Sequence, residues 1–141
     1  MKLFVFAVAL LMPLIALAEK DYVNGGYWTV TSVDTKEGNF DAYVSDLKNV
    51  WRKFMEAGIK DGKIESYQIF SNVHARAGEP DLWLVVQWKS GGELLDTPDE
   101  YLDAQAEKFF GSYDKGTEAL VKRGDLRTIM STVLMREINF K

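Results

Sequence analysis

The sequence predicts an α+β domain in which two helices cover one face of a four-stranded antiparallel sheet. Segments rich in β-branched and aromatic residues alternate with segments whose apolar residues recur at helical spacing, in the order β-α-β-β-α-β. We find no internal repeat, so we expect one domain over residues 19–141. The chain has no cysteine, and a packed core rather than disulfides must therefore stabilise this domain.

The first strand and the first helix are predicted from their side-chain patterns. Residues 27–33 (YWTVTSV) have the β-branched and aromatic composition of a strand, after a polar lead-in over residues 19–25. Apolar residues then recur at intervals of three and four from Phe40 to Phe54, which is typical of one face of an amphipathic helix. The glycines that follow are expected to end this helix.

Two strands over residues 64–74 and 82–89 form a predicted antiparallel hairpin. They are joined through residues 77–81 (AGEPD), whose glycine, proline and aspartate favour a chain reversal. Short polar residues are interleaved with the apolar ones in the first of these strands, whereas the second, LWLVVQW, is almost wholly apolar. The second strand is therefore expected to lie inside the sheet.

A second helix and a last strand complete the domain. Thr97 is predicted to cap the helix, with Glu100 three residues later closing a capping box. The helix is expected to bend at Gly111 or Gly116. Residues 126–140 alternate again and predict a long strand with a bulge or bend. This order of elements defines the split β-α-β, or ferredoxin-like, topology.

Residues 1–18 (MKLFVFAVALLMPLIALA) have the pattern of a secretory signal peptide. Lys2 precedes an apolar run, and Ala16 and Ala18 are the small residues that a signal peptidase accepts. The run is shorter than the roughly 20 apolar residues that span a bilayer. We therefore expect cleavage before Glu19 and export to the periplasm or the cell exterior, with no membrane attachment of the remaining domain.

Both faces of the predicted sheet are apolar. In a hairpin without a bulge, one face holds Tyr67, Ile69, Val73, Trp83 and Val85, and the other holds Phe70, Leu84, Val86 and Trp88. Two helices cover only one face, so the open face predicts a second copy packed against it, as a homodimeric barrel. The alternative is a monomer, in which polar residues make one face polar enough to remain exposed to solvent. These are Gln68, Asn72, His74 and Gln87.

The chain resembles a known group of proteins over essentially all of residues 19–141. The resemblance is carried by the segments GGYWTVTSVDTKEGNFDAYVSDLKNVWRKFMEAGIKDGKIESYQIF and PDLWLVVQWKS. These are similar to exported members of the dimeric α+β barrel proteins, which include antibiotic-biosynthesis-monooxygenase-like, EthD-like, NIPSNAP-like and Dabb domains. The group contains oxygenases, haem-handling enzymes and proteins without known activity, so the resemblance implies a fold and a dimer but does not select a reaction.

Composition excludes several classes of partner. The formal net charge of −4 disfavours binding to nucleic acid or to anionic membranes. Without cysteine there is no thiolate for a zinc or iron–sulfur site. The acidic residues between Glu93 and Asp103 match no calcium loop, and Gly91-Gly92 lacks the lysine of a phosphate loop and predicts only a turn. We expect no metal and no cofactor.

His74 is the only histidine of the chain. It could act as a general base or as an axial haem ligand. No second ligand and no base–nucleophile pair lies near it in the sequence, which favours an exposed residue at a strand end.

The remaining candidate site is aromatic. Strand aromatics mixed with amides could line a pocket for a small aromatic or apolar molecule. The candidate ligand-binding residues are Tyr27, Tyr67, Asn72, His74, Trp83, Gln87 and Trp88. Trp83 and Trp88 should point to opposite faces of the sheet, so one pocket can hold only one of them. Three interpretations stay open: a binding protein, a cofactor-independent monooxygenase-like enzyme, and a non-catalytic interaction dimer.

Overall fold

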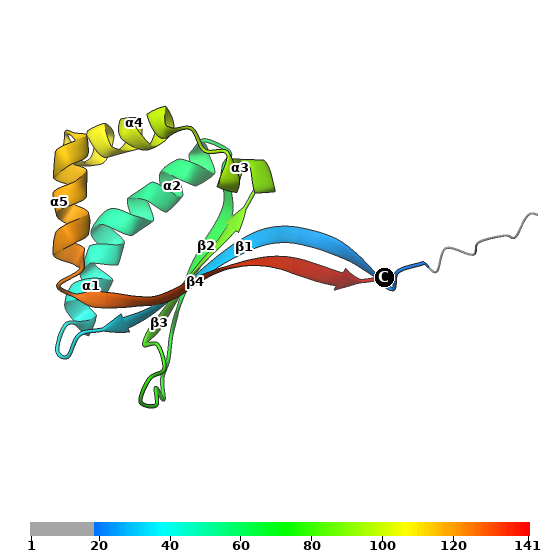
Figure 1. Ribbon diagram of the computed structural model, residues 1–141, viewed down its shortest axis with the longest axis horizontal. Helices are drawn as coiled ribbons and strands as arrows, with labels where there is room; N and C mark the ends of the chain where they lie inside the picture. The colour runs from blue at the N-terminus through cyan, green and yellow to red at the C-terminus, as the bar shows by residue number, and fades with distance from the viewer. Residues whose placement is uncertain (1–18) are drawn as a thin grey trace, which may run out of the picture.

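The computed structural model describes residues 19–141 as one antiparallel sheet with helices on one face (Figure 1). The expected signal peptide lies outside the described residues. The elements follow one another as β1 (Tyr22–Thr35), α1 (Phe40–Asp46), the π-helical turn η1 (Leu47–Trp51), α2 (Arg52–Lys60), β2 (Ile64–Ser71), β3 (Leu82–Trp88), α3 (Gly91–Leu95), α4 (Asp99–Phe110), α5 (Tyr113–Arg123) and β4 (Arg127–Phe140).

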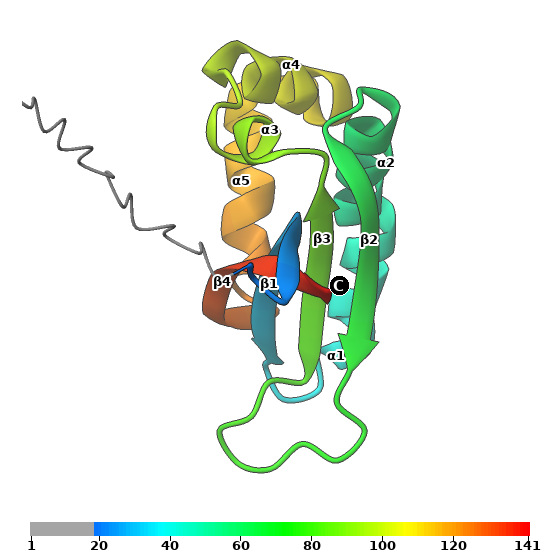
Figure 2. The same cartoon turned by 90° about the vertical axis from the view of Figure 1, so that its right-hand side faces the viewer.

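The strands lie in the order β2-β3-β1-β4, and each neighbouring pair is antiparallel (Figure 2). The parallel strands β1 and β2 are therefore separated by β3, and β3 and β4 are separated by β1. This is the split β-α-β arrangement that the element order predicts, and the predicted topology is confirmed.

The helices differ from the prediction in their details. The first predicted helix is a continuous run from α1 through η1 to α2. The second is divided by Gly111, whose φ of 85° ends α4 in the left-handed conformation and confirms the predicted bend. The predicted capping box is wrong: Pro98 is the N-cap residue, and the Thr97 hydroxyl instead donates to the Glu93 carbonyl oxygen over 2.7 Å.

The glycine pair after β3 is part of a short helix and not only a turn. The Ser90 hydroxyl accepts the backbone N–H of Glu93 over 3.1 Å and caps the first turn of α3. The capping hydroxyl outweighs the low helix propensity of the two glycines, which is why the turn prediction from Gly91-Gly92 was wrong.

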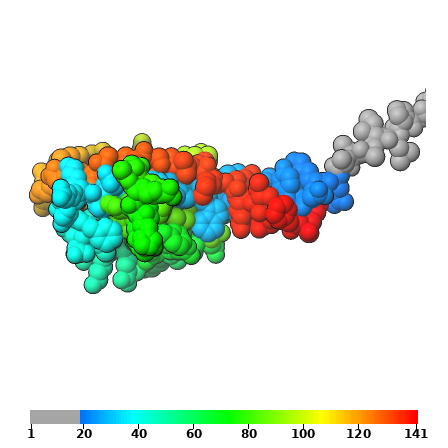
Figure 3. Space-filling model, turned by 90° about the horizontal axis from the view of Figure 1, so that it is seen from below, coloured from blue at the N-terminus to red at the C-terminus, as the bar shows by residue number. Residues whose placement is uncertain are grey.

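A two-stranded arm projects from the domain (Figures 1 and 3). It forms because β1 starts at Tyr22, within the residues expected to be a lead-in, and pairs there with the end of β4. The pairs are Tyr22 with Phe140, Val23 with Asn139 and Asn24 with Ile138. In contrast, β3 accompanies β1 only from Tyr27 onward. The arm is therefore supported by backbone pairing rather than by packing.

The observed register corrects the predicted faces of the hairpin. Tyr67 pairs with Val86 and Ile69 with Leu84, so odd-numbered residues of β2 share a face with even-numbered residues of β3. Directly paired residues project to the same side of an antiparallel sheet. The loop from β2 to β3 sets this register, which alternation within each strand does not determine. Trp83 and Trp88 do point to opposite faces, as predicted.

The core lies between the sheet and the first helical run. Its fully buried members are Val33 of β1, Leu82 of β3, Tyr43 of α1 and Leu47 of η1. Trp51 and Leu126 pack against this cluster from its edge. Because α4 and α5 pack mainly on each other and on α2, they leave β4 uncovered on both faces, and Leu134 is 50% exposed.

The opposite face of the sheet carries no helix. Where all four strands pair, each contributes three residues to this open face, in three rows of paired residues. The rows are Phe70-Trp83-Ser32-Ser131, Gln68-Val85-Val30-Val133 and Ser66-Gln87-Trp28-Met135. None of these residues is charged, and more than half of them are apolar, so this central part of the face has the composition of a buried surface. By strand alternation, Asp34 of β1 and Glu137 of β4 lie on the same side beyond the three rows.

Within residues 19–141, no helix combines the length and the apolar character needed to cross a bilayer.

Candidate functional site

An apolar cleft of about 400 Å³ lies between the first helical run and the α4–α5 pair. Its lining residues come from η1, α2, α4 and α5, and Figure 1 shows how these helices are arranged. Its lining residues are Val50, Trp51, Phe54, Met55, Leu102, Ala106, Phe110, Tyr113, Gly116, Thr117, Leu120 and Arg123. This size and composition are those of a site for a small apolar molecule.

The sequence forms this cleft through helical spacing and one glycine. The π-helical turn η1 directs Val50 and Trp51 to one wall, and Phe54 follows one turn later. Gly116 lies in the opposite wall, where a Cβ atom would lie 3.2 Å from the Phe110 ring and would require this ring to shift. Phe54 also packs on Phe110 with ring centres 5.8 Å apart. These aromatic contacts hold α2 against the α4–α5 pair without filling the space between them.

A second cavity, of about 270 Å³, adjoins the cleft. The two share the lining residues Phe54, Met55 and Leu102, so they are neighbouring spaces in the helical layer. The second cavity is also lined by Trp88 of β3, and by Tyr101 and Gln105 of α4.

Tyr101 joins the second cavity to a cluster of polar side chains. Its hydroxyl donates to Asp61 over 2.9 Å, and the Lys63 ammonium lies 4.8 Å from the centre of its ring. Lys63 in turn pairs with Glu93 over 2.6 Å. Burial and the hydrogen bond to Asp61 raise the pKa of the Tyr101 phenol to about 12. The phenol is therefore a hydrogen-bond donor at neutral pH.

Arg123 forms the polar end of the main cleft. It is 9% exposed, and its Nε atom donates to the Asp46 carboxylate over 2.5 Å. This ion pair joins the end of α5 to the end of α1. The Nη2 atom of Arg123 is buried and has no hydrogen-bond partner.

The structure separates the seven residues predicted to bind a ligand into three groups. Tyr27, Tyr67 and Trp88 lie on the helix-covered face of the sheet, and Trp83 and Gln87 lie on the open face. The other two, Asn72 and His74, belong to the loop between β2 and β3. No single pocket can hold all seven.

The residues of the first group pack in the helical layer. Trp88 lines the second cavity and donates from Nε1 to the Thr29 hydroxyl over 3.0 Å. Tyr67 meets Trp51 edge to face, with ring centres 5.3 Å apart. Tyr27 lies under the Arg136 guanidinium, 4.6 Å from ring centre to guanidinium carbon, and accepts a hydrogen bond from it.

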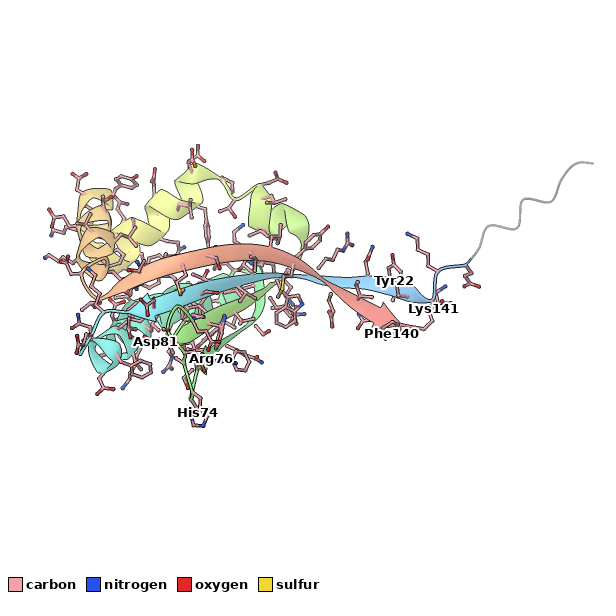
Figure 4. All side chains as sticks on the ribbon, turned by 60° about the horizontal axis from the view of Figure 1, so that its bottom comes forward. Tyr22, His74, Arg76, Asp81, Phe140 and Lys141 are labelled. Atoms are coloured by element: carbon pink, nitrogen blue, oxygen red, sulfur yellow. The ribbon has the colours of Figure 1, made fainter. Side chains whose placement is uncertain are left out.

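Asn72 and His74 shape the β2–β3 loop, away from the cleft. The Asn72 side chain donates to the Pro80 carbonyl oxygen over 3.2 Å and accepts the His74 backbone N–H over 3.2 Å. The His74 ring projects outward from this loop (Figure 4). Strand β2 ends at Ser71, so the strand expected to reach His74 is shorter than predicted. These contacts fit the exposed-loop interpretation of His74.

Trp51 and Arg123 were not among the candidate site residues that the sequence suggested. The structure places both at the cleft. A signal for Arg123 was present in the sequence, because Gly116, Leu120 and Arg123 recur at intervals of four and three on one helix face. An arginine that continues an apolar stripe points inward.

Among residues 19–141, no group of three or more histidine, aspartate or glutamate side chains is arranged to hold a metal ion.

Comparisons with known proteins bear on the fold. No protein-family model matches the chain, and no curated protein matches it. Protein SO0527 from Shewanella oneidensis is similar in structure, with a TM-score of 0.53 and 12% sequence identity over 84% of this chain and 99% of that one. A dimeric ferredoxin-like protein from an uncultured marine organism has a TM-score of 0.52 and 11% identity, over 84% of this chain and 90% of that one.

The chain has the ferredoxin-like fold. The strand order and both solved structures agree on this point, and they confirm at the level of the fold the resemblance to dimeric α+β barrel proteins. Identities of 11 and 12% carry no information on activity.

Proposed function

We propose that this protein binds a small apolar molecule in the cleft between α2 and the α4–α5 pair, as one subunit of an exported homodimer. The observation that carries the binding proposal is the cleft of about 400 Å³ with its largely apolar lining. Filling it removes apolar surface of both ligand and protein from water, which contributes about 25 cal/mol for each Å².

A cleft-filling substitution tests this function. Ala106 lines the cleft, and Ala106→Phe should occupy it, whereas Ala104→Phe makes the same change on the exposed side of the same helix. In the unmodified protein and in Ala104→Phe, 1-octanol, octanoate or 2-naphthol should quench tryptophan fluorescence saturably and raise the melting temperature. In Ala106→Phe both responses should be lost. No response to any of the three probes in the unmodified protein contradicts the proposal.

The homodimer is proposed from the open face and from β4. The three central rows of the open face have no charged residue, and a surface of that composition is suited to a second copy of itself. The 14-residue edge strand β4 is exposed on both faces, which leaves apolar surface and an unpaired edge for a partner. One of the structurally similar proteins is described as dimeric.

Export is proposed from the pattern of residues 1–18. If it is correct, protein recovered from outside the cytoplasmic membrane has an intact mass that begins at Glu19. A mature species that keeps the apolar segment contradicts this part of the proposal.

A further inference from the structure

The polar end of the cleft is built around a buried guanidinium group. The Arg123 side chain is 10% exposed, and it lines the cleft together with Leu120 and Thr117. Asp46 engages its Nε atom over 2.5 Å. Arginine has five N–H donors in a planar fork, so one such bond leaves further donors to be satisfied.

One of these donors lacks a partner inside the protein. The Nη2 atom of Arg123 is buried and makes no hydrogen bond. Leaving a buried donor unsatisfied is costly, and the cost is larger for a charged group. Solvent does not reach Nη2 either, so an acceptor that enters the cleft and moves in beside the Arg123 guanidinium gains an interaction that this chain does not supply.

The charges around Arg123 favour an anionic acceptor over a neutral one. Arg127, at the start of β4, lies with its guanidinium carbon 5.8 Å from the centre of the Tyr43 ring, and its Nε atom is also buried without a partner. Tyr43 is near Arg127, Arg123 and Asp46. Burial raises the pKa of the Tyr43 phenol above its ordinary value, so it remains neutral at pH 7.

This cluster of Arg123, Arg127, Tyr43 and Asp46 contains two cationic groups and one carboxylate. The cleft lining contains no aspartate or glutamate, so no carboxylate of the lining residues offsets the charge of Arg123. The C-terminal end of α5 stabilises the cationic form of Arg123. The cluster therefore has one cation more than it has carboxylates, and Arg123 is its member that lines the cleft.

We propose that the ligand of the cleft is an apolar acid, whose carboxylate accepts a hydrogen bond from Nη2 of Arg123 while its apolar body lies between Trp51, Phe54 and Phe110. This inference rests on the proposed function, because it names the ligand class of the same cleft. A carboxylate supplies both the acceptor that Nη2 lacks and the negative charge that the Arg123–Arg127–Asp46 cluster lacks. Arg123 is thus the specificity-determining residue of the site.

A matched pair of probes tests the inference. Octanoate and 1-octanol have chains of the same length and differ in the charged end. Titration calorimetry on the purified protein at pH 7.5 should show octanoate binding about ten- to a hundredfold more tightly, the range expected for a hydrogen bond to a charged group. In Arg123→Gln this ratio should fall to about one, with the 1-octanol affinity little changed.

Arg52→Gln is the matched control. It removes the same charge from an exposed arginine of α2 that pairs with Glu56, and the octanoate preference should persist. Asp46→Asn adds a prediction in the opposite direction, because removing this carboxylate leaves the cluster more positive and should tighten octanoate binding without tightening 1-octanol binding. Circular dichroism establishes that each variant is folded.

The outcomes separate this inference from the proposed function. Equal affinities for octanoate and 1-octanol in the unmodified protein overturn the acid inference and leave the apolar cleft as the binding site. A preference for octanoate that persists in Arg123→Gln also overturns it. If neither probe binds, the acid inference fails, and if 2-naphthol does not bind either, the proposed function fails as well. Should Arg123→Gln fail to fold, the ratio in the unmodified protein and the response of Asp46→Asn decide.

Discussion

A single charge placed at Val30 tests whether the open face of the sheet is a subunit interface. Val30 pairs directly with Val85 on one side and Val133 on the other, at the centre of three rows of residues without a charge. In a face-to-face dimer an aspartate there is buried without a cation, at a cost of about 3 to 5 kcal/mol. Since 1.4 kcal/mol is a factor of ten, we expect Val30→Asp to raise the dimer dissociation constant at least about a hundredfold.

Sedimentation velocity at micromolar concentrations measures this change. The unmodified protein should have twice the mass of one chain, and Val30→Asp should have the mass of one chain. Val121→Asp is the matched control, because Val121 is 70% exposed on α5, and this variant should remain dimeric. The reasoning is refuted if the unmodified protein is a monomer, or if folded Val30→Asp dimerises with unchanged affinity.

Three further predictions concern stability. Leu47→Ala, at a position 1% exposed, should lower the unfolding free energy by about 2 to 5 kcal/mol in urea titrations, and Val44→Ala, at a 40% exposed position, by much less. Gly111→Ala should cost about 1 to 2 kcal/mol because Gly111 has a φ of 85°, whereas Gly92→Ala in α3 should be near neutral or stabilising. The pKa of Tyr101 is raised to about 12, so the folded state holds this proton more tightly than the unfolded state. The resulting contribution to the free energy of unfolding is present below about pH 10 and is lost towards pH 12. The melting temperature of the unmodified protein should therefore fall more steeply over this range than that of Tyr101→Phe. Parallel decreases in the two proteins would contradict this assignment.

Several elements were readable from local patterns alone. The recurrence of apolar residues from Phe40 to Phe54 predicted the first helical run, although not its π-helical turn. Gly111 was one of two predicted bend sites, and it ends α4 because glycine readily adopts a positive φ. The last strand contains the expected irregularity, since Met130 lies outside the pairing between Ser131 and Ile129. Each of these features depends on neighbours within a few residues.

Other features depended on contacts between distant segments, and sequence reasoning missed them. The lead-in before Gly25 is a strand because the end of β4, more than a hundred residues later, supplies its hydrogen-bond partners. The register of the hairpin depends on the conformation of the β2–β3 loop. The turn residues Gly78 and Pro80 predict a chain reversal but not that conformation. The positions of the seven candidate site residues also depend on contacts between distant segments, so the sequence did not predict their separation into three groups.

The sequence by itself determined the order β-α-β-β-α-β and an excess of apolar strand surface, because periodicity and turn residues act locally. The tertiary structure decided which residues meet. It brought Trp51, Phe54 and Phe110 from separate helices around one cleft and placed Arg123 at the end of that cleft. The physical reason is that a cleft is space left between packed elements, so its position depends on helix placement and on single residues such as Gly116, rather than on the pattern within any one segment.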